Sequence, residues 1–474
     1  MKLKLVVASM SVLGLISFPL FAADNTDTAN TTSATATTGN ADPAPKHKRH
    51  HMKKSHGMVK ASCRSDVAPM QPAPVVMTTP MVDNYGVILD SSTQNLGRMI
   101  HASPDWFQRI AVVGGMNFDA HWGNLSMGYL GENNRRLSVN DAYLNVTALV
   151  NDWTKAFASI SYNDATSFAT SASSVLHSVK QGIYSAGYSN INFDSIGSSN
   201  LNMEQAYITF GNFSCTPFFV QLGKQFQDFG RYQIHPLERT MAQVLSESLQ
   251  TSAKVGFETQ MGFHGSVYSF DNTLTKVGNG HTQPIFGALL GIDQPSDQLG
   301  WDLGVGYLSN MTGVNDVAYA INVFESNTPG ANIVGTYGRT VGAWSAYGDI
   351  NSGPFSLSAR YASAAQKWDV GTMTTFFQTA SGTGARPWAA DITAGYAFTA
   401  WCKNQDIYLG YQASGNAVNM LLPRNRWILG YDIDVVKNTT LGAELGRDQD
   451  YSNGNGGSGR TTGTIGARAS VKFG

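Results

Sequence analysis

Four histidines in a basic tract near the N-terminus are the residues whose spacing first suggests metal chemistry. His47, His50, His51 and His56 lie within KHKRHHMKKSHGMVKASCR, residues 46–64, which holds seven Lys and Arg and no acid. Imidazole nitrogens bind transition metals, so the four rings could converge on one ion. The neighbouring lysines would repel a cation, however, and no carboxylate joins the cluster. The alternative is a solvated basic tract that contacts anionic partners such as lipid headgroups or peptidoglycan.

Residues for covalent or acid–base catalysis form no recognisable motif. The sequence contains no GxSxG, no HExxH, no Walker loop and no GxGxxG that opens a helix after a strand. The single histidines His235, His264 and His281 fit lumen or loop positions better than the base of a catalytic triad. We therefore expect no enzymatic activity and no cofactor.

The composition favours a membrane barrel over a soluble protein. Only 14% of the 474 residues are charged, whereas soluble domains carry roughly a quarter. Glycine is abundant, aromatic residues are spread along the chain, and the net charge of −1 argues against a nucleic-acid partner. Cys63, Cys215 and Cys402 are too few for a disulfide framework; one pair could form, and the spacing does not say which.

The chain divides into three parts by composition. Residues 1–22 combine two lysines, a short apolar run and small residues at the expected cleavage site, which predicts a secretory signal peptide. Residues 23–108 are Thr-, Lys/His- and Pro-rich, which predicts a mostly disordered periplasmic extension with one short helix in 90–107. Residues 109–474 form the predicted barrel, and no apolar run after the signal peptide is long enough for a transmembrane helix.

Alternation at a period of two predicts the strands of this third part. In the last segment Ile465, Ala467, Ala469, Val471 and Phe473 alternate with polar or small residues. About sixteen strands are predicted, at 109–118, 135–149, 153–164, 200–213, 216–229, 249–258, 260–271, 283–293, 297–310, 339–351, 354–365, 387–400, 404–415, 424–436, 438–449 and 460–473. The fold class is thus all-β, an antiparallel transmembrane barrel.

The connections between these strands alternate between short turns and long loops. The longest are 165–199, 230–248, 311–338 and 366–386, and short periplasmic turns with long external loops are typical of outer-membrane barrels. We expect the longest of them, 165–199, to fold inward and constrict the lumen. No segment resembles the plug domain of an energy-coupled transporter.

Two predicted strands fit this pattern poorly. In 216–229 the apolar face would carry Lys224 towards lipid, which is costly unless the lysine lies at an interface. In 339–351 Trp344 falls on the face opposite Val341 and Ala343, so the register or a boundary is wrong there.

Charged residues on the polar face predict a mixed-charge lumen. The lumen-lining candidates are Asp141, Asp302, Arg360, Asp391, Asp406, Asp432, Asp434, Glu444, Arg468 and Lys472. Opposed charges either orient a polar solute in a transverse field or pair with one another and keep the lumen wet. The loop candidates are Arg135, Arg136, Arg231, Arg339 and Arg386, which would attract an anionic solute or bind lipopolysaccharide phosphates.

One stretch of the barrel resembles the LbtU-type siderophore porins of Gram-negative bacteria. The motifs are Ala206-Tyr207-Ile208-Thr209-Phe210-Gly211-Asn212, Pro217, Gly223-Lys224-Gln225 with Phe229-Gly230, Leu245-Ser246-Glu247 and the earlier Asp141-Ala142-Tyr143-Leu144. The similarity is sharpest over residues 135–249. It implies an outer-membrane barrel for ferric-siderophore uptake and supplies no ligand-contacting residues. The terminal Phe473-Gly474 departs from barrels that end on the aromatic residue itself.

The sequence therefore predicts a bacterial outer-membrane barrel that takes up a ferric siderophore without a plug domain. The alternatives are a general or anion-selective diffusion porin, and a structural or adhesive protein tethered to peptidoglycan by its basic tail. Outer-membrane lipid and lipopolysaccharide are the expected surroundings, and the sequence leaves the oligomeric state open.

Overall fold

The fold was analysed in a computed structural model. It describes residues 81–82, 88–89, 110–124, 133–163, 200–212, 215–231, 237, 240–259, 261–294, 296, 298–326, 335–373, 384–420 and 422–473. The predicted signal peptide, the four-histidine tract, the helix in 90–107 and the loop 165–199 lie outside these residues. Before the barrel, β1 (Met81–Val82) pairs with β2 (Ile88–Leu89) as a short antiparallel hairpin.

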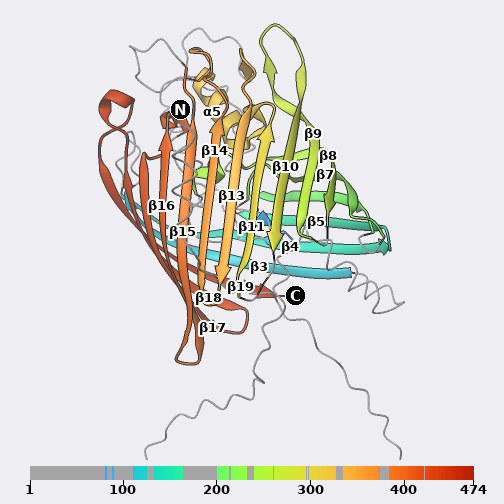
Figure 1. The fold of residues 1–474 in the computed structure, drawn as a ribbon. Helices are drawn as coiled ribbons and strands as arrows, with labels where there is room; N and C mark the ends of the chain where they lie inside the picture. The colour runs from blue at the N-terminus through green and yellow to red at the C-terminus, as the bar shows by residue number, and fades with distance from the viewer. Residues whose placement is uncertain are drawn as a thin grey trace, which may run out of the picture. The chain divides into compact units, whose positions relative to one another are not determined.

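Sixteen antiparallel strands within the described residues close into a barrel, as the alternation predicts. They are β3 (Ile110–Asn124), β4 (Asn133–Asn151), β5 (Thr154–Asn163), β6 (Asn200–Phe210), β7 (Phe218–Phe226), β8 (Leu249–Glu258), β9 (Phe263–Lys276), β10 (Thr282–Gln294), β11 (Gly300–Leu308), β13 (Ala343–Ser352), β14 (Phe355–Ala364), β15 (Trp388–Ala400), β16 (Lys403–Gly415), β17 (Asn425–Val436), β18 (Thr439–Gln449) and β19 (Thr461–Phe473). Each predicted range overlaps one of them. The barrel closes where β19 pairs with β3, and Figure 1 shows β10, β11, β13, β14 and β15 side by side in one wall.

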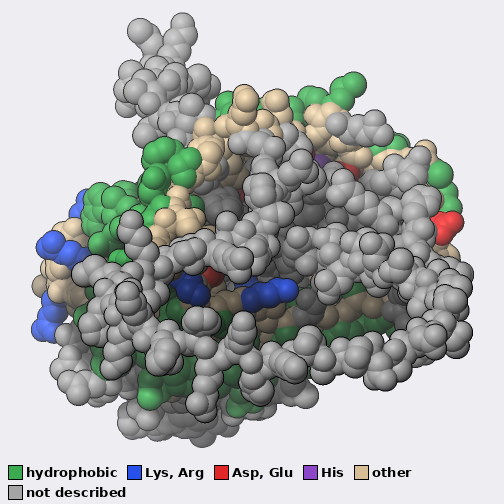
Figure 2. All heavy atoms as spheres, turned by 90° about the horizontal axis from the view of Figure 1, so that it is seen from below, with side chains coloured by type: hydrophobic (Ala, Val, Ile, Leu, Met, Phe, Trp, Pro, Cys, Tyr) green, Lys and Arg blue, Asp and Glu red, His purple; other side chains and the backbone are tan. Residues whose placement is uncertain are grey.

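The wall of the barrel is apolar outside and polar inside. On β11, Leu303, Val305 and Tyr307 are exposed on the outer face, whereas Asp302 is buried on the inner face. Figure 2 shows hydrophobic side chains along the outer wall and Lys and Arg side chains within the ring of the wall. Because an apolar outer band suits lipid and a closed sheet leaves no unpaired edge, this barrel is suited to span a lipid membrane.

The helices of the described chain lie in the connections between strands. They are α4 (Met241–Val244), η2 (Met311–Gly313), α5 (Asn315–Ser326), η3 (Val418–Met420) and η4 (Asn453–Asn455). A further short strand, β12 (Thr336–Tyr337), pairs in parallel with β9. Figure 1 shows α5 at the opposite end of the barrel from the β17–β18 turn. None of the described helices is long and apolar enough to cross a membrane.

The structure accounts for both poorly fitting segments, the later one by a strand boundary and the earlier one by a hydrogen bond. Strand β13 begins at Ala343, so Val341 belongs to the preceding connection and is buried there, while Trp344 is 49% exposed on the outer face. The predicted start of that strand at residue 339 was therefore wrong. Lys224 does lie on the outer face of β7, where its Nζ donates a hydrogen bond of 2.9 Å to the Met203 carbonyl oxygen. This contact offsets part of the cost of a charge near lipid.

Chemical labelling of Cys215 tests which end of the barrel faces the periplasm. Cys215 lies in the short β6–β7 turn with a free, exposed thiol, and Cys402 is disulfide-bonded. Because short turns are periplasmic in such barrels, a maleimide carried on a polyethylene glycol too large to cross the outer membrane should label Cys215 only after that membrane is permeabilised. In a Cys215→Ser background, Asn453→Cys in η4 should be labelled on intact cells. The reverse pattern would contradict this orientation.

Candidate functional site

The connection between β7 and β8 turns into the barrel. Its described residues, 227–231, 237 and 240–248, are termed the lumen segment, and all of them except Asp228 and Leu237 are buried. The sequence predicted residues 230–248 as an external loop and assigned the inward fold to 165–199. The first of these expectations was wrong, because the polar groups of this connection bond to inward-facing side chains of the wall. The loop 165–199, to which the second expectation applies, lies outside the described residues.

A single helical turn gives the lumen segment its local structure. Helix α4 begins after Thr240, whose Oγ1 accepts a hydrogen bond of 3.2 Å from the Gln243 N–H and so satisfies one end group of the helix. Met241 and Val244 belong to the same buried apolar cluster as Val317 and Ile321 of α5. Hydrophobic packing between two connections therefore holds α4 inside the barrel.

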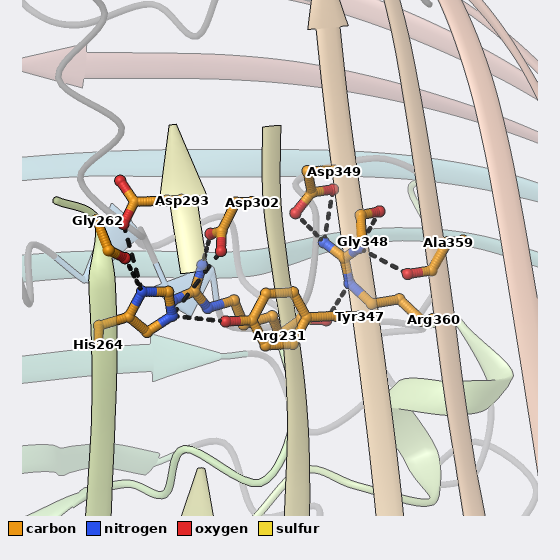
Figure 3. A network of polar contacts seen from close by, with 10 residues as sticks. All are labelled: Arg231, Gly262, His264, Asp293, Asp302, Tyr347, Gly348, Asp349, Ala359 and Arg360. Carbon is orange, nitrogen blue, oxygen red and sulfur yellow. Dashed lines mark hydrogen bonds and ion pairs between the residues drawn. The ribbon is translucent and has the colours of Figure 1, made fainter. Parts of the chain in front are cut away.

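Arg231 fastens the start of the lumen segment to the wall. Its side chain is 10% exposed and forms an ion pair with the side chain of Asp302 of β11, which is 5% exposed. A guanidinium nitrogen lies 3.2 Å from His264 Nε2, and Arg231 Cζ lies 4.3 Å from the centre of the Tyr347 ring. Figure 3 shows these side chains converging from separate strands and from the segment. The guanidinium thus gains an ion pair and a cation–π contact together.

His264 bonds through both ring nitrogens. Nδ1 lies 3.2 Å from the Gly262 carbonyl oxygen and 3.3 Å from Asp293 Oδ1, and Nε2 lies 2.9 Å from the Tyr347 hydroxyl oxygen. With the proton on Nδ1, this nitrogen donates towards Gly262 and Asp293, and the single lone pair of Nε2 faces the donors Tyr347 and Arg231. The imidazole therefore serves as a junction between strands β9, β10 and β13.

Two glycines make room for this junction. A Cβ at Gly291 of β10 would lie 2.2 Å from His264 Nε2, and one at Gly304 of β11 would lie 2.4 Å from the Tyr347 ring. Gly291 is the cross-strand partner of His264, and Gly304 is that of Tyr347. Each large side chain can lie flat against the neighbouring strand only because that strand carries a glycine opposite it.

Arg360 of β14 holds the backbone of the lumen segment. Its Nε donates to the Arg231 carbonyl oxygen, and its Nη2 donates to both carboxylate oxygens of Asp349 at 2.9 Å. The hydroxyl of Ser345 donates to the Phe229 carbonyl oxygen. Wall side chains thereby satisfy carbonyl groups that would otherwise be buried without a partner.

The middle of the lumen segment is bound to the side of the barrel formed by β15, β18 and β19. Asp391 of β15 accepts a hydrogen bond of 3.1 Å from the Ala242 N–H, and Glu444 of β18 accepts one of 2.8 Å from the Leu237 N–H. Arg468 of β19 donates to the Leu237 carbonyl oxygen at 3.2 Å. The segment thus crosses the lumen from the β8–β9 side towards β19.

Asp228 adds an ionic contact close to β7. It accepts hydrogen bonds of 2.8 Å from Lys254 Nζ and of 2.6 Å from the Ser266 hydroxyl. Burial by itself would raise the pKa of Asp228, but the charge of Lys254 and these hydrogen bonds outweigh burial and hold the pKa below its ordinary value.

This lowered pKa predicts a pH-dependent loss of stability. Because the folded-state pKa is depressed, the contribution of Asp228 is present above the ordinary pKa of 3.8 and is lost as the pH falls through the folded-state value. In urea unfolding, Asp228→Asn should be less stable than the unaltered protein near neutral pH, and the difference should shrink at about pH 2. A difference that stays constant with pH would contradict this role.

The structure places the predicted lumen residues as follows. The buried ones are Asp302, Arg360, Asp391, Asp432, Glu444 and Arg468, the partly buried ones are Asp406, Asp434 and Lys472, and the side chain of Asp141 is outside the described set. The arginines among them pair with carboxylates, Arg360 with Asp349 and Arg468 with Asp119 at 2.7 Å. Asp302, Arg360, Asp391, Glu444 and Arg468 all contact the lumen segment.

The predicted loop arginines separate into two groups. Arg339 and Arg386 are exposed, and Arg339 donates to Gln366 Oε1 at 2.7 Å. Arg231 is buried and ion-paired within the barrel, so its prediction as an external loop cation was wrong. The side chains of Arg135 and Arg136 are not among those described.

Sequence reasoning missed several residues of this site. Tyr347, Asp349 and Lys254 all lie on inward faces of their strands. For Tyr347 and Asp349 the apolar Val341 and Ala343 hid the signal, because they share this inner face and made it resemble the lipid-facing side. Lys254 alternates with outward-facing Ala253 and Val255 and could have been found from the same pattern. In the described part of the chain, no group of three or more His, Cys, Asp or Glu could hold a metal ion.

Comparison with known proteins gives distant relatives. No family model matches the chain. A UPF0422 protein of Coxiella burnetii is 24% identical over 274 residues, 56% of this chain and 56% of that protein. The UPF0422 protein lpg2959 of Legionella pneumophila subsp. pneumophila is 25% identical over 268 residues, 54% of this chain and 48% of that protein. The matched region therefore spans about half the length of these curated relatives.

Solved structures similar to this chain are outer-membrane channels. OprB of Pseudomonas putida has a TM-score of 0.50 and 10% identity, with 77% of this chain and 94% of that chain covered. The outer-membrane channel DcaP of Acinetobacter baumannii has a TM-score of 0.46 and 12% identity, with 77% and 97% covered. At such identities the likeness to OprB shows the fold, and this chain has the porin-like β-barrel of a bacterial outer-membrane protein.

Proposed function

We propose that the protein is a channel through which small polar solutes diffuse across the outer membrane, and that the lumen segment constricts it. The observation that carries this proposal is a segment inside the polar barrel interior that is held on two sides of the wall, at Arg231 by Asp302 and at Leu237 by Glu444. A segment held in this way narrows a water-filled lumen without a separate plug domain.

Ion pairing inside the barrel bears on the selectivity of this channel. Arg231, Arg360, Arg426 and Arg468 each form an ion pair with an aspartate. Because each of these cations has a carboxylate beside it, they add little net field to the lumen. We therefore favour a general channel with weak ion selectivity over an anion-selective one.

Planar-bilayer recording tests the channel directly. The purified full-length protein should give discrete conductance steps, and a salt gradient should produce a reversal potential close to zero. A protein that inserts but stays electrically silent would favour the structural or adhesive alternative. A strongly anion-favouring reversal potential would contradict the weak selectivity argued from the paired arginines.

A ferric siderophore is the specific solute that we infer from the resemblance over residues 135–249. The test is uptake of radioactive iron supplied as the ferric siderophore to iron-limited cells, with and without the gene. Loss of uptake that the gene restores would support this solute. Unchanged uptake would leave a general channel as the function.

For the basic tract 46–64 we propose contact with anionic envelope components such as lipid headgroups or peptidoglycan, with metal binding by its histidines as the alternative. Deleting residues 46–64 should release the barrel from isolated peptidoglycan if the first role holds. It should lower the metal retained by the purified protein if the second holds. If the deletion changed neither the binding to peptidoglycan nor the amount of metal retained, both proposed roles of the tract would be excluded.

A further inference from the structure

A half-open cavity of about 70 Å³ lies along the inner wall formed by β6 to β9, beside the lumen segment. Its lining combines side-chain amides with aromatic rings: Gln205, Gln221, Gln225, Tyr207, Phe219 and Phe226. Such a lining offers neutral hydrogen-bonding groups next to apolar surface, which is typical of small-molecule sites.

The cavity is lined by four Asp, Glu, Lys and Arg side chains, and three of them, Asp228, Lys254 and Arg231, form ion pairs with protein groups; Glu258 is the fourth. Asp228 is held by Lys254 at 2.8 Å, and Arg231 is paired with Asp302. A charged solute would have to compete with these existing pairs for its counter-charge. The cavity therefore favours a neutral solute over an anion or a cation.

Gln205 supplies a donor that lacks a partner. It is 2% exposed, and its Oε1 accepts a hydrogen bond of 3.4 Å from the Phe226 N–H. Its Nε2 has no hydrogen-bond partner among the described residues. A buried donor in this state is unfavourable, so an acceptor oxygen of a bound solute would be stabilised beside it.

Two further glutamines supply acceptors. Gln221 Nε2 donates to Thr209 Oγ1 at 3.1 Å, and Gln225 Nε2 donates to Ser252 Oγ at 3.2 Å. With each amide nitrogen bonded to the wall, the carbonyl oxygen of each side chain remains to accept a hydrogen bond. The cavity thus presents one donor and two acceptors, which is the pattern that hydroxyl groups match.

Tyr207 places an aromatic ring among these amides. It occupies the inner face of β6, in sequence between Gln205 and Thr209, and its cross-strand partner on β7 is Gly223. The φ of Gly223 is +135°, and a Cβ there would lie 2.2 Å from the Ala206 carbonyl oxygen. Only glycine fits this position, so no β7 side chain stands opposite Tyr207.

We propose that this cavity binds a small neutral polyol or the hydroxyl-bearing edge of a sugar. The solute hydroxyls would accept from Gln205 and donate to Gln221 and Gln225, while its C–H surface would lie against Tyr207 and Phe219. The inference rests on the proposed channel only for delivery of the solute. Binding itself can be measured whether or not the barrel conducts ions.

The test is an NMR titration of the purified full-length protein in detergent micelles with glucose, gluconate and glucosamine. Glucose should bind more tightly than its anionic and cationic counterparts. Gln205→Leu should raise the dissociation constant for glucose by about tenfold or more, since it removes the unpaired donor. Asn145→Leu is the matched control, because Asn145 is a buried amide on β4 that does not line the cavity, and its affinity should be unchanged.

Several results would overturn the proposal: no glucose binding, tighter binding of gluconate or glucosamine, or an unaltered affinity in Gln205→Leu. If Gln205→Leu does not assemble into a barrel, Gln221→Met tests the same site and should also weaken binding. Bilayer recordings separate the two proposals. If the protein conducts ions but does not bind glucose, the sugar site is excluded and the channel is supported. If it binds glucose but does not conduct ions, the channel is excluded and the sugar site is supported.

Discussion

Arg231→Leu is expected to destabilise the barrel by about 3–5 kcal/mol, the usual cost of removing one partner of a buried ion pair. The variant leaves the Asp302 carboxylate buried without its counter-charge. It also removes the guanidinium that lies over the Tyr347 ring and contacts His264. Urea unfolding of the purified protein, followed by tryptophan fluorescence, measures the loss.

Two further variants identify the cause of this loss. Arg231→Leu combined with Asp302→Leu should recover most of the stability, because the unpaired charge is then gone. Arg339→Leu is the matched control, since Arg339 is exposed and donates a hydrogen bond of 2.7 Å to Gln366 Oε1; it should change the free energy of unfolding by less than about 0.5 kcal/mol. A double variant as unstable as Arg231→Leu would show that the ion pair is not the cause.

Replacing residues 234–246 by a short Gly-Ser linker is expected to raise the single-channel conductance several-fold. The replacement removes α4 and its contacts with Asp391 and Gln412, together with the Leu237 contacts to Glu444 and Arg468. Arg231 and Asp228 remain, so the ionic contacts at the start of the lumen segment are kept. With the crossing segment gone, ions meet a wider water-filled lumen.

The matched control for this replacement is a deletion at the tip of the β9–β10 hairpin. Residues 278–280 are exposed there, and no atom lies within 4 Å of a Cβ placed at Gly278 or Gly280. Removing them should leave the conductance unchanged. If the replacement of 234–246 also left the conductance unchanged, the lumen segment would not be the constriction.

The strands of this barrel could be predicted because their signal is local. A residue such as Asp302 lies between outward-facing Trp301 and Leu303, and that alternation alone marks it as an inward residue. The exception at β13 has a local cause as well. Val341 is apolar because it packs in the connection before the strand, so it mimicked the start of a strand that begins two residues later.

The candidate site could be predicted only in part. Alternation indicated that Asp391 and Glu444 face inward, but it gave no indication that both bind backbone N–H groups of a connection. Leu237 and Glu444 are 207 positions apart, and Leu237 and Arg468 are 231 positions apart. Contacts between residues so far apart in the sequence produce no periodic pattern in either segment. The connection between β7 and β8 was therefore predicted as an external loop.

From the sequence alone follow the all-β class, the sixteen-strand count, the apolar outer face and the charged inner face, since each depends on residues one or two positions apart. The tertiary structure decided which connection enters the lumen, which partner each inward charge takes and where the cavity between β6 and β9 lies. These features exist only once β19 meets β3 and closes the barrel, because closure brings Arg231, Asp391 and Glu444 around one enclosed space.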